Sequence, residues 1–183
     1  IGRMALQNNQ YQQAFRHLQQ SLALATQLQD EEQLASIHFR LGMAYRKLDQ
    51  HTQALLHFEQ AGQRYLKLNR MPTYSYVLVY MAESYLEEPV QIDKAEELLQ
   101  QALKIAEEHR HMTRAATAYY SLGRAAMLRH DYAASEAYYH KALQHFRQNN
   151  ARSLLHETSL AIVQLLLQQQ RYAEATTMLN ELT

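Results

Sequence analysis

The sequence predicts an all-α protein in which antiparallel helix pairs stack into a solenoid, and two observations support this prediction. Glycine and proline are rare, with four and two residues in 183, whereas the helix-favouring residues Ala, Leu, Gln and Glu abound. The stretch Leu41–Ala61, LGMAYRKLDQHTQALLHFEQA, also has the same spacing of small and large residues as Leu122–Ala142, LGRAAMLRHDYAASEAYYHKA. A spacing that returns along the chain indicates a repeat protein, because each helix pair must dock on the next in the same way.

The small residues of this pattern recur about every 40 residues along the whole chain. The first small position is occupied by Gly2, Gly42, Ala82, Gly123 and Val163. About twelve residues later the next is occupied by Ala14, Ala54, Ala95, Ser135 and Ala175, and four residues further on come Leu18, Phe58, Leu99, Tyr139 and Leu179. A small residue lets one helix press against the backbone of its neighbour, so close helix contacts are expected here. The one irregularity, at Pro89, predicts a turn that is one residue longer.

Each repeat is expected to form two helices whose apolar residues lie on one face. The predicted first helices are Glu32–Leu48, Thr73–Glu87, Thr113–Arg129 and Arg152–Gln169. The predicted second helices are Tyr11–Leu28, Thr52–Leu68, Asp93–Glu108, Tyr132–Gln148 and Tyr172–Leu182. Short polar turns are expected at Asn8–Gln10, Asp49–His51 and Arg129–Asp131, with Asp49, Asp93 and Asp131 as N-caps. One domain, 1–183, would then hold about five repeats, the first incomplete: 1–29, 30–69, 70–110, 111–150 and 151–183.

Composition excludes several classes of site. Lys plus Arg and Asp plus Glu both number 18, so the chain as a whole has no electrostatic attraction to nucleic acid or to an anionic membrane. Cysteine is absent, which rules out disulfides and thiolate zinc sites and fits a cytoplasmic protein. No apolar run has the length of a membrane span. The opening IGRMALQNNQ has neither an initiator Met nor the organisation of a signal peptide, so we expect a fragment of a longer chain.

The spacing within the repeats resembles the tetratricopeptide repeat (TPR). The resemblance rests on Leu41-Gly42-x-x-Tyr45, Ala54-x-x-x-Phe58 and Ala61, and again on Leu122, Gly123, Tyr132, Tyr139 and Ala142. Two features depart from the pattern: the Trp that often opens it is replaced by His38, Leu78, Tyr119 and Ser159, and the period is about 40 rather than about 34 residues. Repeats of the HEAT and armadillo type have periods near 40, but the spacing inside each repeat favours the TPR.

Long TPRs of this kind are similar to those of bacterial signalling-peptide receptors, including Rap-type phosphatases and PlcR-like regulators, and to those of some eukaryotic scaffold proteins. The resemblance implies a right-handed superhelix of antiparallel helix pairs whose first helices line a concave face.

No enzyme motif is present, and no cofactor or metal is predicted. His156–Leu160, HETSL, begins like a zinc-protease helix but has Leu160 where the second His must be. His109 and His111 could contact a metal, but no further ligand is placed near them by the sequence. An acidic cluster is formed by Glu87, Glu88, Asp93, Glu96 and Glu97. It spans a turn and a helix start, so capping and solubility explain it better than acid–base chemistry.

Once the core positions are set aside, the first helices keep a second face, which the resemblance places on the concave surface. There we predict a peptide-binding groove of Arg40, Met43, Arg46, Tyr76, Tyr80, Glu83, Tyr120, Arg124 and Met127. Arg can hold a carboxylate through two parallel hydrogen bonds, and aromatic residues and Met are typical of binding hot spots and adaptable contacts. The alternatives are that the aromatic residues pack between neighbouring helices and that the arginines are solvated surface charges.

The predicted function is non-catalytic binding of a protein or peptide segment, with no nucleic acid or membrane as partner. One alternative is the peptide-sensing domain of a bacterial transcription regulator or phosphatase whose effector domain lies outside this chain, and another is a scaffold that uses the convex face. The Lys/Asn/Arg clamp of chaperone-binding TPRs is absent, because Phe39 and Met43, or Val79 and Glu83, stand where its Lys and Asn should be. Apolar Leu179 and Leu182 at the end of the solenoid make a homo-oligomer possible.

Overall fold

The predicted all-α solenoid is confirmed by a computed structural model, which describes residues 2–87 and 90–181 and the side chains from Gln13 onward. This part of the chain contains nine helices and no strand. The helices are α1 Gly2–Gln27, α2 Glu31–Lys47, α3 His51–Lys67, α4 Met71–Tyr85, α5 Ile92–Glu108, α6 Met112–Leu128, α7 Tyr132–Gln148, α8 Arg152–Gln168 and α9 Tyr172–Asn180. From α2 onward the predicted bounds agree within about two residues, and the division into five repeats stays a prediction. The predictions for Glu88, Pro89 and Leu182 lie outside the described residues.

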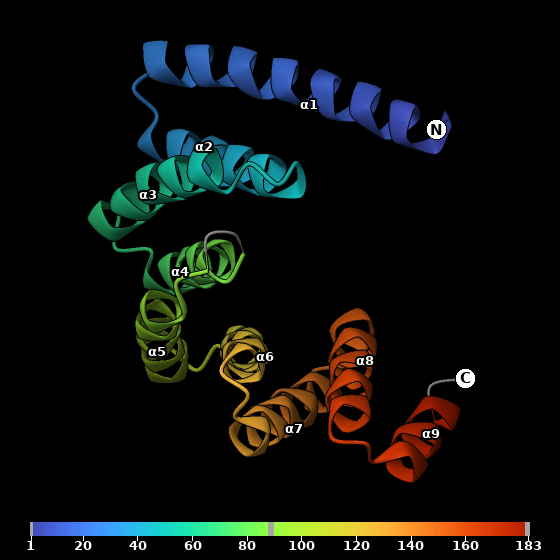
Figure 1. Ribbon diagram of the computed structural model, residues 1–183. Helices are drawn as coiled ribbons and strands as arrows, with labels where there is room; N and C mark the ends of the chain where they lie inside the picture. The colour runs from blue at the N-terminus through green and yellow to red at the C-terminus, as the bar shows by residue number, and fades with distance from the viewer. Residues whose placement is uncertain (1, 88–89, 182–183) are drawn as a thin grey trace.

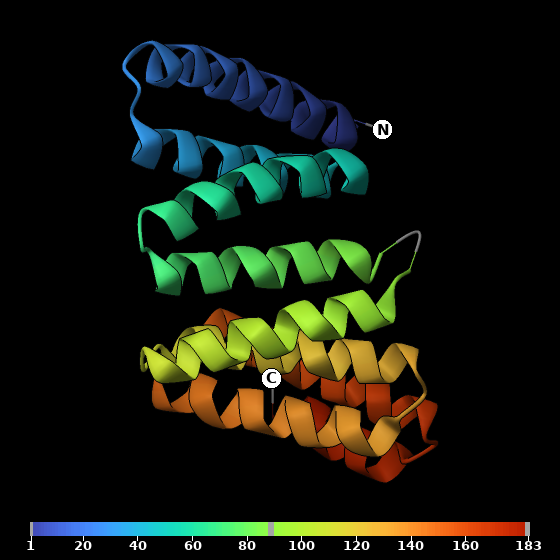
Figure 2. The ribbon, with the colours of Figure 1, turned by 90° about the vertical axis from the view of Figure 1, so that its left-hand side faces the viewer.

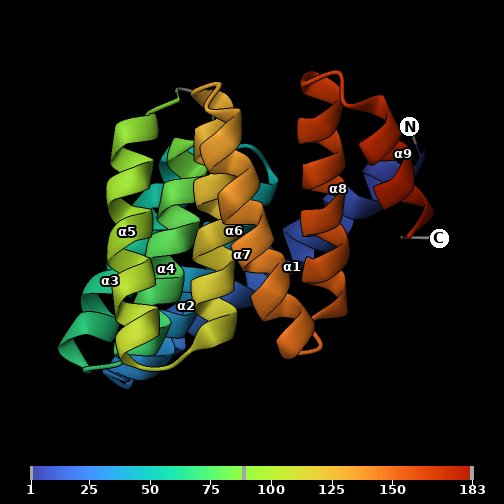
Figure 3. The ribbon, with the colours of Figure 1, turned by 90° about the horizontal axis from the view of Figure 1, so that it is seen from below.

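The helices form a curved stack in which α2, α4, α6 and α8 lie on the inner side and α3, α5, α7 and α9 on the outer side (Figure 1). Each helix contacts the next one along the chain, and the inner helices also contact one another from α2 to α4 and from α4 to α6. Figure 2 shows α1 to α5 stacked one above another, and Figure 3 shows that the axes of α4 to α8 are roughly aligned. The inner helices therefore present side chains from several repeats to one surface.

The same turn ends each helix except α4 and α9 in the described chain. At Asp49, for example, φ is 56°, the Asp49 amide donates to the Arg46 carbonyl, and the Gln50 amide donates to the Tyr45 carbonyl. This is the Schellman motif, which usually places glycine at the left-handed position. Here that position is taken by Gln29, Asp49, Asn69, Arg110, His130, Asn150 and Gln170. Short turns of one geometry explain how a chain with four glycines reverses direction so often.

Two of the three predicted N-caps are wrong. Asp131 is the N-cap of α7, and its side chain accepts a hydrogen bond from the Ala134 amide. Asp49 occupies the left-handed position of its turn instead, and Asp93 lies inside the first turn of α5, where its charge favours the helix dipole. A cap that was not predicted is Asp30, whose side chain caps α2 by accepting a hydrogen bond from the Gln33 amide.

The predicted turn at Asn8–Gln10 is also wrong, because α1 runs unbroken through it as a helix of 26 residues. The segment contains polar residues but neither glycine nor proline, so nothing in it breaks the ladder of backbone hydrogen bonds. A separate helix before Asn8 would have only a few residues, too few to repay the cost of starting a helix.

Gly42 and Gly123 make room for an aromatic ring from the second helix of their own pair. A Cβ atom added to Gly42 would lie 2.5 Å from Cδ1 of Phe58, and one added to Gly123 would lie 2.5 Å from Cδ1 of Tyr139. The close approach predicted from the spacing is confirmed, although the contacting group is a ring rather than the neighbouring backbone. Phe58 and Tyr139 are both buried as a result.

Candidate functional site

The nine predicted groove residues lie on the inner helices α2, α4 and α6 (Figure 1). Glu83 is buried, Arg40 is exposed, and the other seven are half-buried. The structure brings Arg46, Tyr76, Tyr80 and Glu83 into one connected set of contacts, and Arg124 interacts with this set through the charge of Glu83. No direct polar contact in the described chain links this set to Arg40, Met43, Tyr120 or Met127.

An aromatic cluster, defined as Phe39, Tyr76 and Tyr80, joins α2 to α4. The Phe39 and Tyr80 ring centroids are 5.3 Å apart and nearly perpendicular, and those of Tyr76 and Tyr80 are 4.9 Å apart. The Tyr76 and Tyr80 hydroxyl oxygens are 3.0 Å apart and share a hydrogen bond. Burial, followed by the hydrogen bond with Tyr76, raises the pKa of Tyr80. Tyr80 therefore stays a neutral phenol, and the cluster offers apolar rings with polar tips.

A polar network, defined as Arg46, Glu83, Ser121, Arg124 and Glu87, continues from this cluster across three helices. The Arg46 Nη2 atom of α2 lies 3.0 Å from the Glu83 Oε2 atom of α4, and the Ser121 hydroxyl of α6 donates to Glu83 Oε1 over 3.0 Å. Arg124 of α6 donates to Glu87 over 2.9 Å. Burial lowers the pKa of Arg124, but the carboxylates of Glu83 and Glu87 outweigh that effect and raise it.

This network changes what the predicted arginines can do. The sequence could not show that Arg46 and Arg124 already have carboxylate partners, so a ligand carboxylate must compete with Glu83 and Glu87. Arg46 also lies over the Tyr80 ring, with 5.4 Å between the guanidinium carbon and the ring centroid. The network consequently holds the aromatic cluster in place as well as carrying charge.

Three of the remaining predicted residues, Tyr120, Met43 and Met127, contribute mainly to packing. Tyr120 packs on Tyr139, with ring centroids 5.8 Å apart, while its hydroxyl donates to Glu157 of α8 over 3.2 Å. Met43 packs against the buried cluster around Phe58, and Met127 packs against the one around Tyr139. For these residues the packing alternative explains the contacts that the structure shows.

A basic hollow, which was not predicted from the sequence, opens near the N-terminal ends of the inner helices α4, α6 and α8. It has a volume of about 460 Å³ and is lined by Tyr76, Arg110, His111, Met112, Thr113, Arg114, Thr117, Asn149 and Leu154. None of these described lining residues is acidic. The segment HRHMTR, His109–Arg114, carried a signal for it in its density of basic side chains.

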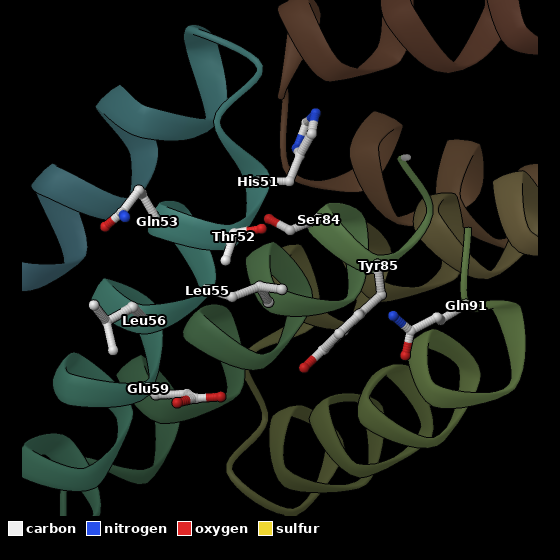
Figure 4. A pocket seen from close by; sticks show the side chains of 9 residues that line it. All are labelled: His51, Thr52, Gln53, Leu55, Leu56, Glu59, Ser84, Tyr85 and Gln91. Atoms are coloured by element: carbon white, nitrogen blue, oxygen red, sulfur yellow. The ribbon is translucent and has the colours of Figure 1, made fainter. Parts of the chain in front are cut away.

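A different hollow, of about 380 Å³, lies between α3, α4 and α5 (Figure 4). Leu55, Leu56 and Tyr85 give it apolar walls, and Glu59 and Gln91 add polar groups. Leu56 is 53% exposed, whereas the Leu55 side chain is half-buried. This hollow is the feature of the structure that bears on the alternative of a scaffold using the convex face.

Residues of the acidic cluster form ion pairs between helices, a role beyond the predicted capping and solubility. Glu87 pairs with Arg124, and both Asp93 and Glu96 pair with Arg129 at the end of α6. These ion pairs connect α5 and the segment just after α4 to α6. In the described chain no three His, Cys, Asp or Glu side chains gather as a metal site requires. None of the described helices has a stretch long and apolar enough to cross a bilayer.

His38 and His57 form a half-buried pair between α2 and α3, with 3.0 Å between their Nδ1 atoms. One ring must donate and the other accept, so the two rings cannot both be protonated. Burial, followed by the charges of Arg64 and His57, lowers the pKa of His38 to about 4. An unfolded His titrates near pH 6.5. Between pH 6.5 and pH 4, His38 is therefore protonated in the unfolded chain but neutral in the folded one.

The His38 contribution to stability is therefore complete above about pH 6.5 and is lost as the pH falls toward 4. When the pH is lowered from 7.5 to 4.5, the unfolding free energy of the wild type should fall. For His38→Gln we expect this fall to be smaller by about 2 kcal/mol. Urea unfolding at the two pH values measures this difference. His140→Gln, at an exposed position on α7, is the control and should behave like the wild type. Equal losses in all three proteins would contradict the prediction.

Comparisons with known proteins agree with this architecture. Residues 1–67 match the family model of the tetratricopeptide repeat, and a comparison with curated protein sequences gives no match. Among solved structures, the chain is similar to a Rap protein complexed with Competence and Sporulation Factor, with 19% identity over 98% of this chain and 50% of that one, and a TM-score of 0.85. It is also similar to aspartyl phosphate phosphatase F from Bacillus subtilis, with 16% identity, 92% and 44% coverage and a TM-score of 0.82.

The TPR-like repeats of a putative kinesin light chain from Podosopora anserina are similar over 98% of this chain and 88% of their own, with 20% identity and a TM-score of 0.64. At these identities the likeness concerns the fold, and the chain spans about half the length of the two Rap-like structures. The family match over residues 1–67 and the shared fold together confirm that this chain resembles the tetratricopeptide-repeat family, with a solenoid like that of the Rap proteins.

Proposed function

We propose that the chain is a non-catalytic module that binds a peptide or protein segment on its inner face. The observation that carries this proposal is the half-buried aromatic cluster Phe39, Tyr76 and Tyr80, which adjoins the polar network on three consecutive inner helices. Rigid aromatic rings with polar tips bind partners at low cost in conformational entropy. A similar structure is a Rap protein complexed with Competence and Sporulation Factor, which supports ligand binding by a solenoid of this shape.

The polar network supports the same proposal because it fixes the position of the aromatic rings before a ligand arrives. Arg46 contacts both the Tyr80 ring and the Glu83 carboxylate, so the ring and the ion pair restrain each other. A surface that is already ordered loses less entropy on binding. The ligand is then expected to place apolar side chains against Tyr76 and Tyr80.

A narrower candidate is the peptide-sensing part of a regulator whose effector domain lies outside this chain. It is favoured by the length comparison, since the chain spans 44% and 50% of the two similar Rap-like structures. The convex-face scaffold remains the third candidate, and the hollow lined by Leu55, Leu56 and Tyr85 is the surface it would use.

The test is a screen of a random peptide library against the wild type, repeated with Tyr80→Ala. We expect the substitution to weaken the recovered binders about thirtyfold, because truncating a hot-spot residue costs about 2 kcal/mol of binding free energy. Fluorescence anisotropy of labelled binders gives the dissociation constants. Circular dichroism confirms that each variant is folded.

Tyr172→Ala is the matched control, because Tyr172 is 61% exposed and lies on the outer helix α9. Its replacement should change the dissociation constants less than about twofold, as expected for a residue outside the site. If Tyr80→Ala leaves binding unchanged, the inner face is not the site. Loss of binding on Leu56→Ala instead would favour the convex-face scaffold.

A further inference from the structure

The basic hollow combines three basic side chains in one small space. Arg110 and His111 come from the turn before α6, Arg114 comes from its first turn, and Asn149 closes the hollow from the turn before α8. The N-terminal end of α6 points its positive dipole end into the same region. All of these groups favour negative charge, and the described lining supplies none.

Arg114 is the residue whose surroundings are incomplete. Its Nη1 atom is buried and has no hydrogen-bond partner among the described residues. The guanidinium lies over the Tyr76 ring, with 5.8 Å between its central carbon and the ring centroid, and burial lowers the pKa of the group. A guanidinium that is partly buried without a counter-charge is destabilised, so an anion in the hollow would stabilise this arrangement.

Two other half-buried arginines of the inner face already have carboxylate partners, and Arg40 is exposed to solvent. Arg46 is paired with Glu83, and Arg124 is paired with Glu87. Arg114 has no ion pair in the described part of the chain, and the same is true of Arg110 in the turn beside it. An anionic ligand group therefore meets no competing carboxylate in the basic hollow.

We propose that the basic hollow binds an oxyanion, a carboxylate or a phosphoryl group, with Arg114 and Arg110 as its main partners. We further infer that this oxyanion is the anionic group of a bound peptide, and this step rests on the proposed function. Tyr76 makes that link, because its ring contacts Arg114 on one side and lies 4.9 Å from the Tyr80 ring on the other. The oxyanion then fixes one end of a ligand whose apolar side chains lie on the aromatic cluster.

The experiment is an NMR titration of the protein labelled on its arginine side chains. Inorganic phosphate and acetate are the two probes, and sodium chloride at equal ionic strength corrects for general screening. We expect the Arg114 Nε–Hε signal to shift and saturate with at least one probe, because charge-assisted hydrogen bonds to guanidinium are strong. Saturation by phosphate alone identifies a phosphoryl group, and saturation by acetate identifies a carboxylate.

Two variants and one internal control complete the design. Arg114→Met should weaken binding of the saturating probe about tenfold or more, and Arg110→Asn about fivefold. The dissociation constants are followed on the backbone amides of Met112 and Thr113. Asparagine suits position 110, where φ is 56°, so that variant removes the charge without adding backbone strain. Arg16, exposed on α1, is the control arginine and should show only a linear response.

Linear shifts for Arg114 with both probes, or equal behaviour of Arg114 and Arg16, would overturn the proposal. Free ions probe the hollow without any peptide, so this failure would leave the proposed peptide binding intact. Conversely, library binders whose affinity is unchanged by Tyr80→Ala would overturn the inner-face proposal. Saturable phosphate or acetate binding would still support the hollow as an oxyanion site.

Discussion

Replacing Gly123 with alanine is expected to lower the free energy of unfolding by about 2 kcal/mol, although alanine normally favours a helix. The added Cβ atom would lie 2.5 Å from Cδ1 and Cε1 of Tyr139, which is fully packed with 3% exposure. The ring cannot move freely, since the Tyr139 helix is also held by the Ser135 hydroxyl, which donates to the Gly123 carbonyl over 2.9 Å. Thermal and urea unfolding measure the loss.

Gly62→Ala is the matched control, because Gly62 is also a buried glycine inside a helix. Its added Cβ atom would lie 3.4 Å from Cε2 of Tyr74, an ordinary contact. The substitution should therefore raise the unfolding free energy by up to about 1 kcal/mol through helix propensity alone. Similar effects at Gly62 and Gly123 would show that the ring contact is not what requires glycine.

A compensating variant tests the same contact from the other side. In the repeat between α4 and α5 the corresponding residues are Ala82 and Leu99, which share one buried cluster. Gly123→Ala combined with Tyr139→Leu reproduces that pair. We expect the double variant to lose less stability than the sum of the two single losses, by about 1 kcal/mol or more, because the residues are in direct contact. Additive losses would count against the contact.

The sequence predicted the fold well where one physical requirement repeats. The spacing of a small residue and a large apolar residue 16 or 17 positions later, as in Gly42 and Phe58, is visible in the chain because every repeat must solve the same packing problem. The caps were predicted less well, since an Asp before a helix can cap it, as Asp131 does, or occupy the left-handed turn position, as Asp49 does. Both choices satisfy backbone groups, and the sequence does not separate them.

The site was predicted only in part, because its contacts cross between repeats. Helical spacing placed Arg46 and Glu83 on inner helices, but it could not show that they meet at 3.0 Å. The basic hollow was missed for the same reason: Arg114 belongs to a helix start, and the residue beside it, Tyr76, lies 38 positions away in the chain. Spacing within a helix defines a face, whereas the partner across that face depends on how the helices stack.

The polar network offers a second large effect on stability, because its central carboxylate is shielded from water. The side chains of Glu83 and Arg46 are 11% and 20% exposed, and the Ser121 hydroxyl that donates to Glu83 is fully buried. Removing one partner of a buried ion pair leaves the other charge without compensation, which costs more than the pair contributes when intact. Arg46 and Ser121 would both lose their acceptor if Glu83 were shortened.

Glu83→Ala is consequently expected to lower the unfolding free energy by about 3 kcal/mol. Glu32→Ala is the matched control, since Glu32 of α2 pairs with Arg70 at the start of α4 over the same 3.0 Å, but with side chains 58% and 55% exposed. That loss should stay below about 0.5 kcal/mol, because solvent screens an exposed pair. Glu83→Gln should fall between the two, since it keeps an acceptor for Ser121 but removes the charge that Arg46 requires. Urea unfolding of the three variants decides the matter: equal, small losses for Glu83→Ala and Glu32→Ala would show that burial gives this pair no special weight.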